Sequence, residues 1–246
     1  ASSVVRVEYV GRVSYARGLE LQRARHAEVL GWREAAGPTP VGVVLALEHD
    51  PPVITVSRRQ GAMAHLVATP ERVAAAGVEI AETDRGGDIT YHGPGQVVAY
   101  PILDLNRLGL GLHAYMRMLE RVVMDVCAGF GVETVRDEGA TGVWTRGADG
   151  RPGAKIAAMG IRVRRWVSLH GLALNVATDL SHFDLIVPCG LVGRSVTSLE
   201  RELGVAPAVD AAQRAVGAAI ARRVAEALAV RGSGASVEIE IVADIV

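Results

Sequence analysis

The sequence predicts an α+β fold in which helices flank a mixed β-sheet. Short apolar segments with the composition of strands gather in the middle of the chain and follow one another as hairpins. Longer segments with helical spacing lie before, among and after them, without a regular alternation of single strands and helices. Regular alternation is typical of a purely parallel sheet, so its absence favours a sheet with both strand directions.

The composition indicates one globular domain. Half of the 246 residues are hydrophobic, which is enough for a sizeable core, and single domains commonly reach this length. We therefore expect residues 1–246 to form a single domain. The formal net charge of −1 argues against a global attraction to nucleic acid or to a membrane surface, so neither is expected as a partner.

The location expected from the sequence is the cytoplasm. No apolar run of about 18 residues predicts a transmembrane helix, and the first residues lack the basic and apolar regions of a signal peptide. Cys127 and Cys189 are the only cysteines, and they lie in dissimilar contexts. Two such cysteines are poor material for a disulfide framework, which is consistent with a reducing compartment.

The N-terminal part of the chain contains two predicted helices. Helical spacing over residues 15–32 predicts the first, which ends at the Gly- and Pro-containing residues 37–40. Thr69 and Pro70 have the residue types of an N-cap and a first helical position, so the second helix begins there and stops at Gly77. Alternating or fully apolar runs predict strands at residues 4–10, 41–47, 53–56 and 78–80.

A glycine-rich run is the most informative motif of the chain. Residues 85–96 carry four glycines around a β-favouring tripeptide at residues 89–91, and they lead into an apolar strand at residues 97–103. Glycine lets a ligand approach the backbone closely, so Arg85 and His92 within this run indicate a substrate slot. A tight hairpin that carries polar residues without a ligand is the alternative.

The C-terminal part begins with a long amphipathic helix over residues 112–130, closed by Gly131 in the C′ position. Apolar or alternating runs predict strands at residues 143–145, 155–163, 167–176 and 236–242. The second and third of these are expected to pair as an antiparallel hairpin across a corner at residues 164–166. Asp210 is expected to cap a final long helix, and residues 231–235 to form a flexible break behind it.

Three motifs in one order carry a resemblance to a known family. They are the run at residues 85–96, a lysine that enters an apolar strand at residues 153–162, and residues 170–190, which begin with His-Gly-Leu-Ala-Leu-Asn and end with Pro-Cys-Gly. Over residues 41–199 the chain closely resembles the lipoyl/octanoyl transferases of lipoate biosynthesis. The resemblance implies an acyltransferase that moves an octanoyl group from acyl carrier protein to a lysine of a lipoyl domain. It also implies the biotin/lipoate protein ligase-like fold and no cofactor.

One cysteine and one lysine have the properties of reactive groups. Cys189 stands between Pro188 and Gly190, whose backbone preferences can hold a thiol at an exposed turn. Cys127 lies in an apolar helical segment and is expected in the core. Lys155 is the only lysine of the chain, and a cation near a cysteine favours the reactive thiolate. A structural cysteine and a solvated lysine are the alternatives, and the resemblance identifies Cys189 and Lys155 as a catalytic dyad that forms a thioester intermediate.

The resemblance also assigns the acyl and carbonyl parts of the substrate to three segments of the chain. Their residues are Arg85, Gly86, Gly87, Asp88, Ile89, Thr90, Tyr91, His92, Ala158, Met159, Gly160, Gly171, Leu172 and Ala173. His170 is expected to line the same site, although a histidine bonded to backbone is the alternative for both His170 and His92. A narrow apolar tunnel would suit an eight-carbon chain, because burial contributes up to about 0.8 kcal/mol per CH₂.

The partners follow from the same resemblance. They are octanoyl-acyl carrier protein as the donor, and the lipoyl domains of 2-oxoacid dehydrogenase complexes and the glycine cleavage H protein as acceptors. Because acyl carrier proteins are acidic, Arg162, Arg164 and Arg165 are expected to assist docking, with a solvated basic turn as the alternative. No metal site is expected, because the chain has no Cys-x-x-Cys and its histidines are scattered.

Two other functions stay open on the sequence alone. An ATP-dependent lipoate or biotin ligase of the same fold would need to recognise an adenylate and would release pyrophosphate. A non-catalytic acyl-carrier or peptide-binding module would use the glycine-rich slot but would leave Lys155 and Cys189 without a role. An octanoyl adduct on the protein distinguishes the transferase from the binding module.

Overall fold

The computed structural model describes residues 4–191, 193–230 and 238–243. The α-helices are α1 (Tyr15–Gly31), α2 (Pro70–Ala75), α3 (Leu105–Leu108), α4 (Leu112–Gly129), α5 (Leu199–Leu203) and α6 (Val209–Val230). The 3₁₀ helices are η1 (Trp32–Glu34), η2 (Ala62–His65), η3 (Leu180–Leu185) and η4 (Pro188–Gly190). The strands are β1 (Val4–Val13), β2 (Gly42–His49), β3 (Val53–Ser57), β4 (Glu79–Thr83), β5 (Ile89–His92), β6 (Gln96–Leu103), β7 (Thr134–Val135), β8 (Val143–Arg146), β9 (Pro152–Arg164), β10 (Val167–Asn175) and β11 (Glu238–Ala243).

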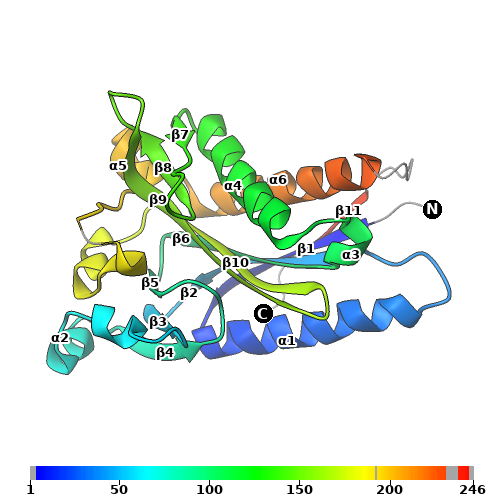
Figure 1. Ribbon diagram of the computed structural model, residues 1–246, viewed down its shortest axis with the longest axis horizontal. Coiled ribbons are helices and arrows are strands. Elements are labelled where there is room, and N and C mark those ends of the chain that lie inside the picture. The colour runs from blue at the N-terminus through cyan, green and yellow to red at the C-terminus, as the bar shows by residue number, and fades with distance from the viewer. Residues whose placement is uncertain (1–3, 192, 231–237, 244–246) are drawn as a thin grey trace.

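Two mixed sheets form the framework of the described residues. The larger has the strand order β11-β1-β2-β6-β10-β9-β8-β7, and the smaller has the order β4-β3-β5. In the larger sheet β1 runs parallel to both β11 and β2, whereas the pairs from β2 through β7 are antiparallel. The predicted α+β class with a mixed sheet is therefore confirmed (Figure 1).

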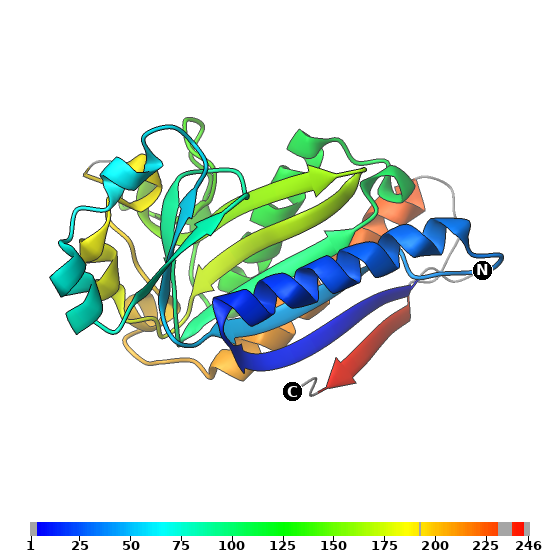
Figure 2. The ribbon, with the colours of Figure 1, turned by 90° about the horizontal axis from the view of Figure 1, so that it is seen from below.

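Helices cover both faces of the larger sheet. Helices α4 and α6 lie on one face and α1 lies along the other (Figures 1 and 2). Side chains of a strand alternate between faces, so Val97 and Ala99 of β6 join the cluster with α4 and α6, while Val98 and Tyr100 join the cluster with α1. The smaller sheet, with α2, lies at the end of the molecule that also holds η3 and η4 (Figure 1).

Most of the expected elements are present, and the capping prediction for α2 is confirmed. The Thr69 side chain accepts a hydrogen bond from the Arg72 N–H, and Pro70 occupies the first helical position. Gly131 follows α4 with a φ of 85°, as a C′ glycine does. The short elements α3, α5, β7 and the 3₁₀ helices were not expected, because so few residues carry no periodicity.

One cap prediction is wrong. Helix α6 begins at Val209, so Asp210 lies within its first turn rather than before it. Its carboxylate accepts from the Ala211 N–H and lies near the positive end of the helix dipole, which accounts for an acid there. The flexible break expected at residues 231–235 lies outside the described residues, and the strand expected beyond it is β11.

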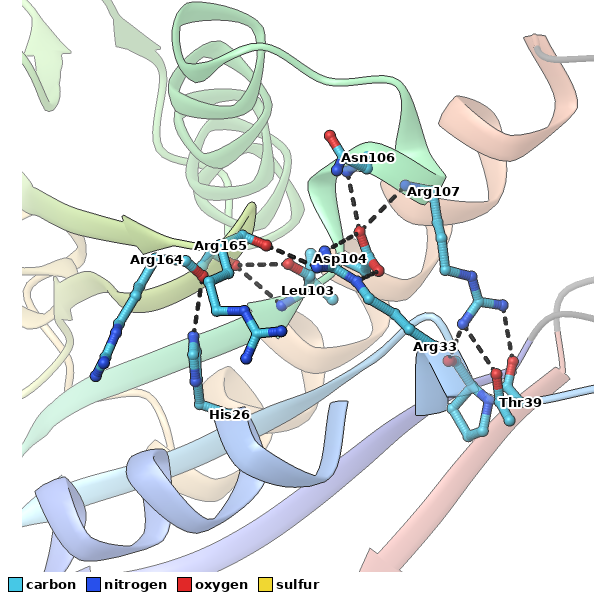
Figure 3. Close-up of polar contacts among 11 residues, drawn as sticks. His26, Arg33, Thr39, Leu103, Asp104, Asn106, Arg107, Arg164 and Arg165 are labelled. Atoms are coloured by element: carbon cyan, nitrogen blue, oxygen red, sulfur yellow. Dashed lines mark hydrogen bonds and ion pairs between the residues drawn. The ribbon is translucent and has the colours of Figure 1, made fainter. Parts of the chain in front are cut away.

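The β9–β10 hairpin turns at Arg164, Arg165 and Trp166, as expected, and the last two adopt positive φ. The turn is held by its backbone (Figure 3): His26 of α1 bonds the carbonyl of Arg164, and Arg33 donates to the carbonyl of Arg165. Figure 1 places this turn at the opposite end of β9 from η4.

Arg33 is itself fixed by a buried acid. It donates from Nε and Nη2 to the carboxylate of Asp104, which is 1% exposed and also accepts from the N–H groups of Asn106 and Arg107 (Figure 3). Asp104 thereby caps α3 and neutralises the guanidinium that holds the hairpin turn. The guanidinium groups of the turn itself are not needed to keep its shape.

Candidate functional site

A cavity of about 250 Å³ lies where the smaller sheet faces the larger one. Strand β5 forms one wall, and β6, β9 and β10 form the other. Because side chains alternate along β5, Thr90 and His92 line the cavity, while Ile89 and Tyr91 pack into a core cluster with Phe183. The glycine-rich run therefore lines a cavity in this structure.

Cys189 lies at this cavity, in the middle of η4. Its φ of 56° is in the left-handed region, which costs a non-glycine residue energy and is often found at functional sites. Gly190 also has positive φ, and a Cβ there would come within 3.0 Å of the His65 ring. The Pro-Cys-Gly turn thus holds the thiol in one strained position.

Asp88 holds the neighbouring segment against η4. Its carboxylate accepts from His65 Nδ1 at 2.7 Å and from the Ile89 N–H at 2.8 Å. The carbonyl of His65 in turn accepts from the Val187 N–H, two residues before Cys189. Asp88 lines the cavity and at the same time ties η2 to the turn that carries the cysteine.

Lys155 is the partner of this cysteine. Its Nζ lies 3.1 Å from Cys189 Sγ, although the two residues are 34 positions apart. The lysine is 6% exposed, and its ammonium also lies 5.0 Å from the centre of the Trp144 ring, which attracts a cation. A buried ammonium at this distance stabilises a thiolate, and it can donate a proton to a departing group.

Cys127 has the opposite environment. It lies on α4, fully buried in the core cluster that this helix covers, and burial raises the pKa of its thiol to about 12. The expected assignment of Cys127 to the core is confirmed.

Gly142 is a residue that the sequence interpretation missed. A Cβ at this position would lie 2.6 Å from Lys155 Cε and 2.8 Å from the Ala157 carbonyl oxygen, and the φ of 138° also favours glycine. The lysine side chain therefore passes over a bare backbone. In the sequence, the glycine before Val143 and Trp144 gave a turn signal only.

A chain of hydrogen bonds runs behind the cavity from His92 towards the backbone of Lys155. His92 Nδ1 bonds Gln96 Oε1 at 2.8 Å, and Gln96 Nε2 donates to Asn175 Oδ1 at 2.9 Å. Asn175 Nδ2 donates to the Thr197 carbonyl, and the Thr197 N–H donates to the Lys155 carbonyl. Since Gln96 presents its oxygen, His92 carries its proton on Nδ1.

His92 is neutral and fixed. Burial, together with the neighbouring His49, lowers the pKa of His92 to about 3. A histidine with so low a pKa is a poor proton acceptor at neutral pH, so it positions groups rather than titrating. The alternative of a histidine bonded only to backbone does not hold for His92, because its hydrogen-bond partner is the side chain of Gln96.

Three aromatic residues line the far part of the cavity, and a polar atom of each forms a hydrogen bond with another side chain. Tyr15 donates to Thr83 Oγ1, Tyr100 bonds His49 Nε2, and His170 Nε2 bonds Asp84 Oδ1. The hydroxyl groups of both tyrosines and Nε2 of His170 are therefore engaged by protein groups. His170 has a φ of 58°, and burial lowers its pKa to about 4.

Arg85 is half-buried beside the cavity and forms no ion pair with a carboxylate among the described residues. Its Nη2 donates to the carbonyl and hydroxyl of Thr55, and its Nη1 donates to the Gly86 carbonyl. Its buried Nε has no hydrogen-bond partner within the described part of the chain. Burial lowers the pKa of this guanidinium. It supplies positive potential at a cavity that also contains Cys189.

The structure gathers most of the expected site residues around the cavity. Those that line it are Cys189, Lys155, Arg85, Gly87, Asp88, Thr90, His92, Ala158, Met159, Gly160, Gly171, Leu172, Ala173 and His170. Gly86, Ile89 and Tyr91 do not line it, and Gly86 instead donates its N–H to the Ile161 carbonyl. The substrate-binding role of these three residues, like that of the residues that line the cavity, stays a prediction.

Two expected site glycines have a packing reason of their own. A Cβ at Gly171 would lie 2.2 Å from the Ala99 carbonyl oxygen, and one at Gly160 would lie 2.6 Å from the Gly86 carbonyl oxygen. Both contacts are with backbone, so with a larger residue β10 could not approach β6 this closely, nor β9 the loop at Gly86. Cavity residues that the sequence interpretation missed are Tyr15, Arg59, Val98, Tyr100, Gly139, Ala140, Thr141 and Leu191.

In the described ranges, no group of three or more histidine, cysteine or acidic side chains could hold a metal ion. A separate search of the same ranges found no helix with the length and apolarity needed to cross a membrane.

Comparisons with known proteins agree with this geometry. Residues 15–221 match the family described as the lipoyl protein ligase A/B catalytic domain. A protein named octanoyltransferase from Acidobacterium capsulatum is 46% identical over 217 residues, which cover 84% of this chain and 83% of that protein. Another octanoyltransferase, from Chloroflexus aurantiacus, is 46% identical over 212 residues, which cover 85% of this chain and 90% of that protein.

A solved structure supports the fold. The putative lipoate protein ligase Ta0514 from T. acidophilum, with bound lipoic acid, aligns with a TM-score of 0.65 at 16% identity and covers 99% of this chain and 90% of that chain. At this identity the likeness concerns the fold alone. The expected biotin/lipoate protein ligase-like fold is confirmed.

Proposed function

This chain belongs to the lipoyl protein ligase A/B catalytic domain family, and we propose that it is an octanoyltransferase of lipoate biosynthesis that works through an acyl-enzyme on Cys189. The observation that carries the proposal is the 3.1 Å contact between Lys155 Nζ and Cys189 Sγ at a largely apolar cavity. A paired thiolate and ammonium are the groups that acyl transfer between a thioester and an amine requires.

In the first step the Cys189 thiolate attacks the carbonyl carbon of the octanoyl thioester. A new C–S bond forms, the C–S bond to the carrier breaks, and the departing carrier thiolate takes a proton from the Lys155 ammonium. The octanoyl chain then lies in the cavity as a thioester of the enzyme.

In the second step Lys155 works as a base. The neutral lysine accepts a proton from the incoming lysine amine, which attacks the enzyme thioester. An amide bond forms, the bond to Sγ breaks, and the thiolate again faces an ammonium.

The hydrogen-bond chain from His92 to Thr197 supports this chemistry by position. It links β5, β6 and β10 to the segment that brackets the Lys155 backbone on both sides. Such a chain fixes β5, the cavity wall opposite β9, relative to Lys155. A fixed wall favours a bound thioester that lies close to the thiol in a near-attack arrangement.

The partners and the location of this activity are part of the proposal. The donor is octanoyl-acyl carrier protein, and the acceptors are lipoyl domains of 2-oxoacid dehydrogenase complexes and of the glycine cleavage H protein. We place the activity in the cytoplasm, where these partners would meet the enzyme.

Intact-mass spectrometry after mixing with octanoyl-acyl carrier protein tests the proposal. The wild-type chain should gain about 126 Da, the mass of one octanoyl group that replaces a proton. Cys189→Ala should gain nothing, because the nucleophile is missing. Cys127→Ala should still gain the adduct and turn over, since Cys127 lies in the core.

The opposite result for the two cysteine variants would contradict the assignment of Cys189 as the nucleophile. An adduct that survives Cys189→Ala and disappears with Cys127→Ala would place the nucleophile elsewhere. If the wild type formed no adduct but released pyrophosphate from ATP and free octanoate, the chain would be a ligase of the same fold.

A further inference from the structure

A second hollow lies directly behind the far wall of the acyl cavity. It encloses about 350 Å³ between α1 and β9–β10, and we call it the α1 groove. It is lined by Leu19, Gln22, Arg23, His26, Ala27, Leu30, Asp84, Arg162, Arg164, Arg165, Leu169 and His170. Among the described residues, His170 alone lines both the cavity and the groove.

His170 is held from the groove side at both its backbone and its ring. Its N–H donates to Gln22 Oε1 at 2.8 Å, and its Nε2 bonds Asp84 Oδ1 at 2.8 Å. Asp84 is in turn paired with Arg162, and Gln22 is 1% exposed. These contacts keep the residue at a positive φ, a strained conformation that persists only where its surroundings impose it.

The other two aromatic residues of the far wall do not border the α1 groove. Tyr15 and Tyr100 are almost fully buried, and neither lines the α1 groove. The Tyr100 ring packs edge-on against the His170 ring at 6.3 Å between centroids, which braces the imidazole from the cavity side. Of these three residues His170 alone borders both hollows, so removal of its side chain is the change expected to join them.

The position of His170 matches the length of an octanoyl chain. Ala158 and Ala173 line a small recess together with Cys189, so their row of the β9–β10 ladder marks the reactive end. His170 pairs with Ile161, three residues farther along the ladder. Three residues of strand span about 10 Å, which is close to the length of an extended eight-carbon chain.

We propose that His170 is the residue that limits acyl length, by closing the end of the acyl cavity against the α1 groove. This deepens the proposed acyltransferase function and rests on it. A chain of eight carbons ends at the imidazole, and each further methylene would have to displace a ring held by Asp84, on a backbone held by Gln22, or fold back within the cavity.

The test compares acyl-enzyme formation from octanoyl-, decanoyl- and dodecanoyl-acyl carrier protein by intact-mass time courses. His170→Gly accepts the positive φ and opens the wall, so the rate with the decanoyl donor relative to the octanoyl donor should rise about tenfold or more. Leu19→Ala enlarges the groove without touching the cavity and should leave that ratio as in the wild type.

A second variant keeps the proposal falsifiable if His170→Gly folds poorly. His170→Asn also tolerates a positive φ and is shorter than histidine, so it should raise the ratio in the same direction with a melting temperature closer to the wild type. A folded His170 variant that retains the wild-type ratio overturns the proposal, and so does a Leu19→Ala variant that shifts the ratio equally.

The wild-type measurement separates this proposal from the function on which it rests. If the wild type forms no octanoyl adduct, the acyltransferase function has failed. If the wild type forms the adduct, and its preference for eight carbons persists in both His170 variants, only the role of His170 has failed.

Discussion

At the scale of single residues, the proposed mechanism depends on Lys155, the only lysine of the chain. Lys155 is buried, touches the sulfur of Cys189 and lies over the Trp144 ring. No carboxylate lies within ion-pairing distance of it among the described residues. Its charge is therefore directed at the thiol rather than cancelled by an acid.

Substitutions of Lys155 should separate its two roles. Lys155→Met keeps the bulk but removes the charge, so less thiolate forms, and alkylation of Cys189 by iodoacetamide at pH 7 should slow about tenfold or more. Lys155→Arg keeps a charge but does not give up its proton. It should retain much of the single-turnover acylation and lose transfer to the lipoyl domain, where a base is needed.

Rates of Cys189 alkylation, of single-turnover acylation and of transfer to the lipoyl domain, measured for each variant, check this prediction. The Cys127 thiol, which is fully buried, serves as an internal reference that should stay unmodified in every variant. Alkylation of the Met variant at the wild-type rate would mean that another group, such as His92 or Arg85, favours the thiolate.

At the scale of elements, the β9–β10 hairpin carries Lys155 near one end and the basic residues Arg164 and Arg165 at the other. Lys155 lies near the start of β9, whereas Arg164 is its last residue, so about 30 Å of strand separates them. Arg162 is paired with Asp84, while Arg164 and Arg165 are exposed, with their turn held by backbone contacts (Figure 3). Docking of an acidic carrier at this turn stays a prediction.

Charge reversal tests the docking role of the hairpin turn. Arg164→Glu with Arg165→Glu should raise KM for the acyl carrier severalfold at low ionic strength, and less so at high salt, because screening weakens surface charge attraction. The turn should keep its shape, since its contacts with His26 and Arg33 use carbonyl groups.

Arg121→Glu, on the exposed side of α4, is the matched control and should leave KM unchanged. A KM that stays the same in the double variant at low salt would remove the hairpin turn from the docking surface. Arg58 and Arg59 would then be the basic residues to change next, because Arg59 lines the cavity itself.

At the scale of the whole molecule, His49, His92 and His170, three of the buried histidines, couple stability to pH. Burial lowers the pKa of His49 and His170 to about 4 and that of His92 to about 3. In the unfolded chain each has an ordinary pKa of about 6.5. Between these values the unfolded state binds protons that the native state does not, so acid favours unfolding.

The free energy of unfolding should therefore fall as the pH drops below about 6.5. Each histidine contributes up to about 1.4 kcal/mol per pH unit until its native pKa is reached. Urea unfolding at pH 7.5, 6 and 5 measures this slope. His92→Gln should make the slope shallower, and a stability that stays constant from pH 7.5 to 5 would contradict the prediction.

Local properties of the sequence were sufficient to predict most of the long elements and to single out candidate reactive residues, whose pairing as a dyad came from the family resemblance. The spacing of apolar residues over 15–32 and 112–130 predicts α1 and α4, because periodicity depends only on neighbours along the chain. Thr69 and Pro70 mark the start of α2 through their own backbone preferences. Cys189 and Lys155 also stand out through local features of the sequence. Cys189 lies in a Pro-Cys-Gly turn, and Lys155 is the single lysine.

The tertiary structure alone decided where these residues meet and what they face. Sequence could not show that Ile89 and Tyr91 point away from the cavity, because the face of a strand is set by the partner sheet. It could not place the hairpin turn far from the thiol, or show that Gly142 makes room for Lys155 and that His170 divides two hollows. Residue types and periods are local, whereas contacts between residues distant in the chain arise from strand register and the packing of two sheets.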